Sequence, residues 1–194
     1  MRATMDRDTI AVVSGLPRSG TSMMMRMLEA GGIPVLTDQI RTADEDNPEG
    51  YYEFERVKQI EEDKAWLLDA QGKVVKMIAA LLKHLPVGYE YQVIFMRRNI
   101  EEVLASQREM LLRRGEPTDA ISDERMATLF KKHVAQVEAW LAEQPNFEIL
   151  YVDYGEVLEE PLEQAKRVSQ FLGYALNIEK MAAVVDPALY RQRR

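Results

Sequence analysis

Cysteine is absent from this 194-residue sequence, and histidine occurs only twice, as His84 and His133. Without cysteine, the chain can form neither a disulfide framework nor a metal site built on thiolates. His84 falls at the end of a short predicted helix and His133 beside an apolar helical stripe, which favours surface or packing roles for both. We therefore expect any catalytic base to be a carboxylate.

The sequence also lacks an excess of positive charge and any long apolar run. Its net charge of −7 argues against nucleic acid as a partner, because phosphate binding normally leaves a basic surface. No stretch approaches the roughly 20 apolar residues of a membrane span, and the charged first residues do not resemble a signal peptide. We expect a cytoplasmic protein with no membrane partner, folded as one domain over residues 1–194. The sequence leaves the oligomeric state open, a homodimer included.

The stretch from Ile10 to Leu28 predicts a strand, a turn and a helix in succession. The β-branched run at its start is typical of a buried strand, and the turn contains Gly15, Pro17 and Gly20. Glycine lets the backbone fold tightly and aim several N–H groups at one point, where the positive end of the helix dipole adds its attraction. This stretch therefore predicts a binding site for phosphate or sulfate.

The spacing of the glycines is similar to that of a Walker A loop, with one departure. The position that should be lysine is Thr21, followed by Ser22, and the cation lies inside the loop as Arg18. A nucleoside triphosphatase uses that lysine on the β and γ phosphates. The loop therefore favours an anion of phosphate type over ATP hydrolysis.

Strand and helix signals alternate along the rest of the chain. This alternation predicts an α/β fold with a central parallel sheet of about four to five strands flanked by helices. The further strands are expected at 33–36, 73–78, 91–96 and 147–152. The further helices are expected at 57–70 and 79–85, from Asn99 and Ser122 onward, and at 154–158 and 161–172.

A second group of polar side chains follows the strand at 91–96. Arg98 comes directly after this strand, and Ser106 lies about two turns into the helix that Asn99 begins. Both could reach a second anion beside the first loop. Lys76 falls near the carboxyl end of another strand, where ligands bind in parallel sheets, and is a further candidate for contact with an anion.

The segment 37–55 has no clear periodicity and is long for a loop in a compact domain, which suggests a working part. It combines aromatic residues with carboxylates. Among these we select Glu53 as the first candidate for a catalytic base, with Asp46 and Glu55 behind it. A solvated acidic loop is the competing interpretation.

Two phrases of the sequence resemble the donor-binding motifs of sulfotransferases. SGLPRSGTS is similar to their 5′-phosphosulfate loop, and RNIEEVLAS to their 3′-phosphate motif, in which an arginine is followed eight residues later by a serine. NPEGYYEFE and YVDYGEVLEEPLEQAKRVSQFLG resemble segments of bacterial members. The resemblance implies a three-layer, P-loop-like α/β domain and the donor 3′-phosphoadenosine-5′-phosphosulfate (PAPS), with no metal required.

The resemblance also implies roles for individual residues. Arg18 would stabilise the transferred group, and the loop residues Pro17, Arg18, Ser19, Gly20, Thr21 and Ser22 would hold the 5′-phosphate. Arg98 and Ser106 would hold the 3′-phosphate. The acceptor would be a small molecule or other organic compound with a hydroxyl or amine. Its base is a separate inference from the residues: with no convincing histidine, we expect a carboxylate of the long loop, Glu53 first and Asp46 and Glu55 behind it.

Two alternatives stay open at this point. A P-loop kinase acting on a small metabolite would share the fold, but it should need Mg²⁺ and a lysine at position 21. A non-catalytic protein that binds 3′,5′-bisphosphoadenosine would keep the 3′-phosphate contacts and lack a working base.

Overall fold

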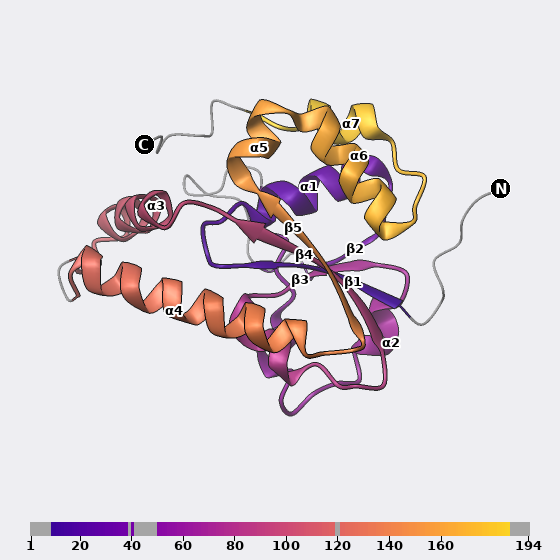
Figure 1. Cartoon of the computed structure of the whole chain (residues 1–194), viewed down its shortest axis with the longest axis horizontal. Helices are drawn as coiled ribbons and strands as arrows, with labels where there is room; N and C mark the ends of the chain where they lie inside the picture. Colours follow the sequence, from indigo (N-terminus) through magenta and orange to yellow (C-terminus); the bar gives the residue numbers. More distant parts are fainter. Residues whose placement is uncertain (1–8, 39, 41–49, 119–120, 187–194) are drawn as a thin grey trace.

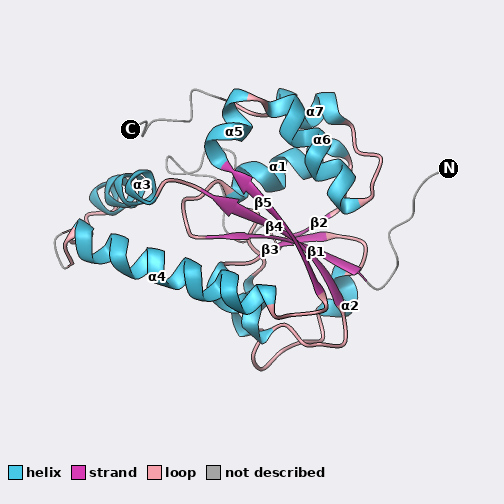
Figure 2. Ribbon diagram, viewed as in Figure 1, coloured by secondary structure: helices cyan, strands magenta, loops and turns pink. Residues whose placement is uncertain are grey.

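The computed structural model describes residues 9–38, 40, 50–118 and 121–186. Its centre is a five-stranded sheet in the order β2-β3-β1-β4-β5, with every neighbouring pair parallel. Helices cover both faces of this sheet (Figures 1 and 2). The predicted three-layer α/β fold is therefore confirmed. The strands are β1 (Thr9–Gly15), β2 (Val35–Leu36), β3 (Val74–Lys76), β4 (Glu90–Arg97) and β5 (Phe147–Asp153).

Strands β1 and β4 form the middle of the sheet. They pair over seven positions, from Thr9 with Glu90 to Gly15 with Met96. The β1 residues Ile10, Ala11, Val12 and Val13 are completely buried, as expected for a strand covered on both faces. The chain runs from β1 to β2 and β3 on one side and then crosses to β4 on the other. Ligands bind at such a reversal of strand order, outside the carboxyl ends of the strands.

Four helices cover one face of the sheet. The helix that follows β1 presents Met24, Met25, Met27 and Leu28 to this face, and all four are completely buried. Together with Val13 they form the centre of the first apolar core. The four helices are α1 (Thr21–Gly31), α5 (Tyr154–Glu159), α6 (Pro161–Leu172) and α7 (Ile178–Ala183), of which α7 was not predicted.

The other face is covered by shorter elements and one long helix. Trp66 and Phe95 are among the largest buried side chains of this second core. These elements are η1 (Glu55–Gln59), α2 (Leu67–Ala70), η2 (Ala79–His84) and α4 (Asp123–Ala142), where η denotes a 3₁₀ helix. The remaining helix, α3 (Ile100–Arg113), follows β4 and lies beside the first half of α4 (Figure 1).

The predicted helix over residues 57–70 is wrong. The chain forms only the short helices η1 and α2 there, because Asp63 makes competing contacts between them. Its carboxylate accepts hydrogen bonds from the Ala65 N–H at 3.1 Å and from Arg56, and its carbonyl accepts one from the Trp66 indole at 3.0 Å. Side-chain bonds of this kind replace the bonds of a continuous helix.

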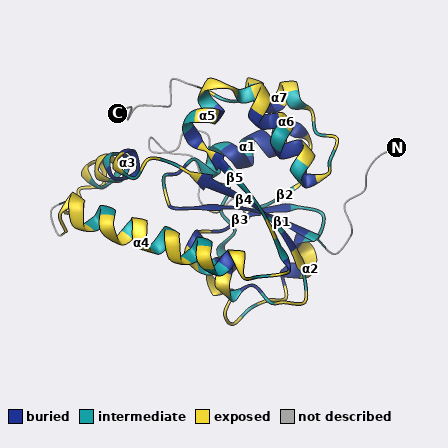
Figure 3. Cartoon of the chain, in the orientation of Figure 1, coloured by how far each residue is buried: buried dark blue, intermediate teal, exposed yellow. Residues whose placement is uncertain are grey.

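The apolar stripe expected along α4 packs on the core only in its second half. Leu141 is buried, and Val134, Val137 and Trp140 pack against the second core. Leu129, in the first half, is 47% exposed, because this half extends past the edge of the sheet (Figures 1 and 3). The first half of α4 is therefore available to line a site next to α3.

Candidate active site

The turn between β1 and α1 forms a cradle that only glycine permits at two positions. Gly15 has φ 146° and Gly20 has φ 96°, both in the region that favours glycine. A Cβ at Gly20 would lie 2.4 Å from the ring of Tyr154. The backbone N–H and the hydroxyl of Ser19 both donate to the carbonyl of Leu16, at 3.2 and 2.7 Å. Ser19 therefore shapes the turn from inside, since its side chain is buried and its N–H is already bonded.

Helix α1 begins directly at this turn. Its N-cap is Gly20, which offers no side chain to the first N–H groups, and its first turn contains no acidic residue. The N–H groups of a first helical turn lack partners within the helix, and the helix dipole places positive charge there. The turn thus has the backbone geometry that suits an anion, and binding of an anion there stays a prediction.

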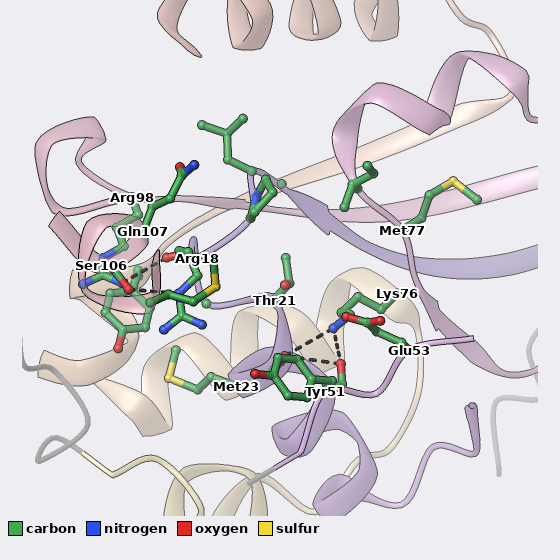
Figure 4. A pocket seen from close by; sticks show the side chains of 18 of the residues that line it. Arg18, Thr21, Met23, Tyr51, Glu53, Lys76, Met77, Arg98, Ser106 and Gln107 are labelled. Atoms are coloured by element: carbon green, nitrogen blue, oxygen red, sulfur yellow. Dashed lines mark hydrogen bonds between the residues drawn. The ribbon is translucent and has the colours of Figure 1, made fainter. Parts of the chain in front are cut away.

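The two predicted anion sites meet in one cavity. The Nε of Arg18 donates to the hydroxyl of Ser106 at 2.9 Å, and Nη1 of Arg98 donates to the backbone carbonyl of Arg18 at 3.0 Å (Figure 4). These contacts join the loop after β1 to the loop and helix after β4. The two strands are paired, so their carboxyl ends bring these residues together although 88 positions separate Arg18 from Ser106.

Arg98 is held by two side chains that the sequence analysis did not select. Its Nε donates to a carboxylate oxygen of Glu102 at 3.1 Å, and both side chains are buried, with exposed fractions of 8% and 5%. Its guanidinium also lies 4.3 Å from the ring centre of Tyr154. Burial raises the pKa of the Tyr154 hydroxyl, although the nearby positive charge of Arg98 acts to lower it. The spacing of four residues between Arg98, just before the N-cap Asn99, and Glu102, in the first turn of α3, was the available signal.

Lys76 lies on the opposite side of the cradle. Its Nζ is 3.3 Å from the hydroxyl of Ser22 and also donates to the backbone carbonyl of Tyr51. In Figure 4, Thr21 lies between this group and the group of Arg18, Arg98 and Ser106. The structure thus places Lys76 where the sequence expected a further contact with an anion.

Of the three carboxylates considered as a base, Glu53 lines the cavity. Its backbone carbonyl accepts hydrogen bonds from the Thr37 hydroxyl at 2.8 Å and from the Asp38 N–H at 3.3 Å. These bonds hold the backbone of Glu53 against residues 37 and 38. Its carboxylate is 3.8 Å from Nζ of Lys58. Glu55 forms a closer ion pair with the same lysine, at 2.6 Å, and is not among the residues that line the cavity. Asp46 lies outside the described residues.

The cavity has a volume of about 710 Å³, which suits a ligand of nucleotide size with room beside it. It is lined by all the predicted donor-binding residues except Ser19, together with Lys76 and Glu53. His84 and His133 do not line it, and His84 lies 3.1 Å from a carboxylate oxygen of Glu61. Within the described part of the chain, no cluster of three or more histidine, aspartate or glutamate side chains could hold a metal ion. Nor does any helix among those residues combine the length and apolar character needed to cross a bilayer.

The sequence matches the family described as sulfotransferase domain over residues 8–193. The chain therefore belongs to the sulfotransferase family, and it is a sulfotransferase enzyme, as its motifs predicted. Comparison with curated proteins gives no match.

Solved structures share the fold at low sequence identity. The sulfotransferase domain of the olefin synthase from Synechococcus PCC 7002 has a TM-score of 0.58 at 15% identity, covering 98% of this chain and 83% of that chain. Sulfotransferase STF1 from Mycobacterium tuberculosis H37Rv has a TM-score of 0.61 at 17% identity, with 93% and 71% covered. Mouse sulfotransferase SULT7A1 complexed with PAP has a TM-score of 0.56 at 20% identity, with 92% and 63% covered. At these identities the likeness supports the fold.

Proposed function

We propose that this enzyme transfers a sulfuryl group from PAPS to a hydroxyl or amine of a small organic acceptor, with the residues of the described cavity in specific roles. The observation that carries the proposal is the contact between Arg18 and Ser106, 2.9 Å long, which joins two anion-binding groups into one cavity. A donor with phosphate groups at two ends requires this arrangement. The mouse relative was solved with PAP, the product that such a donor leaves.

The 5′-phosphosulfate end would lie in the cradle at the start of α1. The backbone N–H groups of Gly20, Thr21 and Ser22 would bind its oxygens, supported by the helix dipole. Lys76, 3.3 Å from the Ser22 hydroxyl, would add a positive charge from the other side. Because the Ser19 N–H is bonded to the carbonyl of Leu16, Ser19 contributes by holding the turn.

The 3′-phosphate end would lie against Arg98 and Ser106. Two of the Arg98 donors are engaged with Glu102 and with the Arg18 carbonyl, which fixes the plane of the guanidinium. An arginine oriented in advance loses less entropy when it binds a phosphate. Ser106 offers its hydroxyl once Arg18 turns toward the transferred group.

The chemical step is an in-line transfer. The acceptor oxygen or nitrogen forms a bond to sulfur while the bond between sulfur and the 5′-phosphate oxygen breaks, and 3′,5′-bisphosphoadenosine (PAP) leaves with that electron pair. Glu53 takes the proton of the acceptor. Arg18 stabilises the negative charge that grows on the bridging oxygen, by analogy with phosphoryl transfer.

Calorimetry with PAP and with ATP, each with and without Mg²⁺, tests the donor assignment. We expect binding of PAP that is independent of Mg²⁺. Binding of ATP that requires Mg²⁺ would support the kinase alternative. Binding of PAP without any consumption of labelled PAPS would support the non-catalytic binding protein.

The second anion site is tested by Arg98→Ala, which we expect to weaken PAP binding by about 1.5–3 kcal/mol, or roughly 10- to 150-fold, the scale of a charged hydrogen bond. Arg97→Ala is the matched control, because Arg97 contacts Glu138 at 2.8 Å and the ring of Tyr151. Equal affinities for the two variants would mean that the second anion site is misplaced.

A further inference from the structure

We propose that Tyr52 and Glu29 form a hydrogen-bonded pair outside the cavity that positions Glu53 as the base. This inference rests on the proposed function and names two positioning residues for it. Neither Tyr52 nor Glu29 is among the residues that line the cavity, so neither is placed to touch the donor or the acceptor. The pair acts through the backbone that carries Glu53.

Tyr52 has a backbone conformation that tyrosine rarely adopts. Its φ is 53°, in the left-handed region, and the only other described non-glycine residue with a positive φ is Arg18. A residue with a Cβ is strained in this region, and the strain persists only where surrounding contacts hold it, most often at functional sites. The contacts of Tyr52 must therefore offset this strain.

A hydrogen bond to helix α1 holds the Tyr52 side chain. Its hydroxyl donates to a carboxylate oxygen of Glu29 at 2.6 Å, and its ring packs against the first core. A hydrogen bond to a carboxylate is shorter and stronger than one between neutral groups. Glu29 lies on α1, the helix that begins at the cradle. The pair therefore fixes the backbone at residue 52 relative to the donor site.

The residues on either side of Tyr52 both line the cavity. Tyr51 is 6% exposed, and its carbonyl accepts hydrogen bonds from Lys76 and, at 3.4 Å, from the Ser22 hydroxyl. The carbonyl of Glu53 is bonded to the segment that follows β2. In Figure 4, Tyr51 and Glu53 lie at the same end of the cavity as Lys76. The backbone angle at Tyr52 therefore determines how the Glu53 carboxylate is directed relative to the cradle.

The position of Glu53 matters because a base works only within hydrogen-bond reach of the proton that it takes. This reach is about 2.6–3.2 Å between heavy atoms, and a displacement of about 1 Å can lower turnover by about 100-fold. The proposed contacts with the donor do not involve the Glu53 carboxylate. The pair should therefore affect kcat and leave the affinity for PAP unchanged.

The hydroxyl of Tyr52 is tested by Tyr52→Phe, which keeps the ring. The readout is turnover of labelled PAPS with whichever of phenol, 1-butanol, glucose and benzylamine the intact enzyme uses fastest. We expect kcat to fall by about 10-fold, while the affinity for PAP, which also reports correct folding, stays within about twofold.

Tyr174→Phe is the matched control for this variant. Tyr174 packs against the same core and does not line the cavity, so its variant should keep wild-type turnover. An unchanged kcat in Tyr52→Phe would overturn the inference. An equal loss of PAP affinity would do the same, because it would indicate a role in holding the fold rather than the base.

Two variants of Glu29 separate the hydrogen bond from the charge. Glu29→Gln keeps an oxygen that can accept a hydrogen bond from Tyr52 and should retain most of its turnover. Glu29→Ala should match Tyr52→Phe. Combining Glu29→Ala with Tyr52→Phe should cause no further loss, because both changes remove the same bond. Losses that add in full would show that the two residues act separately and would refute the pair.

The route through Glu53 is tested by placing Tyr52→Phe in a Glu53→Gln background. Loss of the base should lower kcat by about 100-fold or more. Tyr52→Phe should then cause no further fall, since the group that it positions is gone. A further fall as large as in the wild-type enzyme would mean that Tyr52 acts by another route, and the inference would be wrong.

Failure of the inference can be told apart from failure of the proposed function. If Glu53→Gln lowers kcat and Tyr52→Phe does not, Glu53 is the base and the positioning role is wrong. If Glu53→Gln keeps wild-type kcat, Glu53 is not the base and both are wrong.

Discussion

The buried ion pair between Arg98 and Glu102 gives the sharpest test of how the second anion site is built. The two side chains are 3.1 Å apart and almost completely buried. Glu102→Ala removes this carboxylate from the Arg98 guanidinium, whose side chain is only 8% exposed. Breaking a buried pair from one side typically costs about 3–5 kcal/mol, because the remaining charge is uncompensated.

The structure places this variant near the lower end of that range. Arg98 keeps its hydrogen bond to the Arg18 carbonyl at 3.0 Å and its contact with the Tyr154 ring. We therefore expect Glu102→Ala to lower the free energy of unfolding by about 3 kcal/mol. The double variant with Arg98→Ala should lose less than the sum of the two single variants, because no buried charge remains.

Urea denaturation measures these changes, and the same helix supplies a control. Glu109 forms a pair with Arg113 at the same spacing of four residues, but the two side chains are 48% and 33% exposed. Exposed pairs of this kind contribute about 0.3–0.5 kcal/mol, so Glu109→Ala should change the free energy of unfolding little. If Glu102→Ala lowers the free energy of unfolding no more than Glu109→Ala does, burial does not determine how much the Arg98–Glu102 pair contributes. Our account of how Arg98 is oriented is then wrong.

Two further predictions concern the first turn. Gly20→Ala should lower the free energy of unfolding by clearly more than Gly72→Ala. Both glycines have a positive φ, which costs other residues about 1–3 kcal/mol. A Cβ at Gly20 would in addition lie 2.4 Å from the ring of Tyr154, whereas a Cβ at Gly72 would meet no atom within 4 Å. Similar urea midpoints for the two variants would contradict this. Arg18→Ala should reduce kcat far more than it weakens binding of PAP, because the proposed contact of Arg18 strengthens as charge develops in the transition state. Equal losses in turnover and in PAP affinity would indicate a residue that only binds the donor.

Much of the fold could be read from local pattern. β-Branched runs predicted strands β1 and β4, and the polar side chains of Asn99 and Ser122 predicted where α3 and α4 begin, because each caps its helix through a hydrogen bond to a backbone N–H. The prediction of one helix over residues 57–70 was wrong for a physical reason. The apolar spacing there suits a helix, but the contacts of Asp63 replace the helical bonds between η1 and α2.

The sequence by itself predicted the chemistry of each half of the candidate site. A glycine turn before a helix can bind an anion wherever it occurs, since the backbone N–H groups and the helix dipole are local properties. The same holds for an arginine at the end of a strand with a serine two turns later. These patterns, and the family resemblance they carry, were sufficient to predict a sulfotransferase.

Only the tertiary structure decided how the halves combine. The pairing of β1 with β4 brings Arg18 to Ser106, and the folding of the chain buries Glu102 beside Arg98. Such contacts depend on which strands are neighbours and where helices extend past the sheet, and these are properties of the packed chain rather than of any single segment.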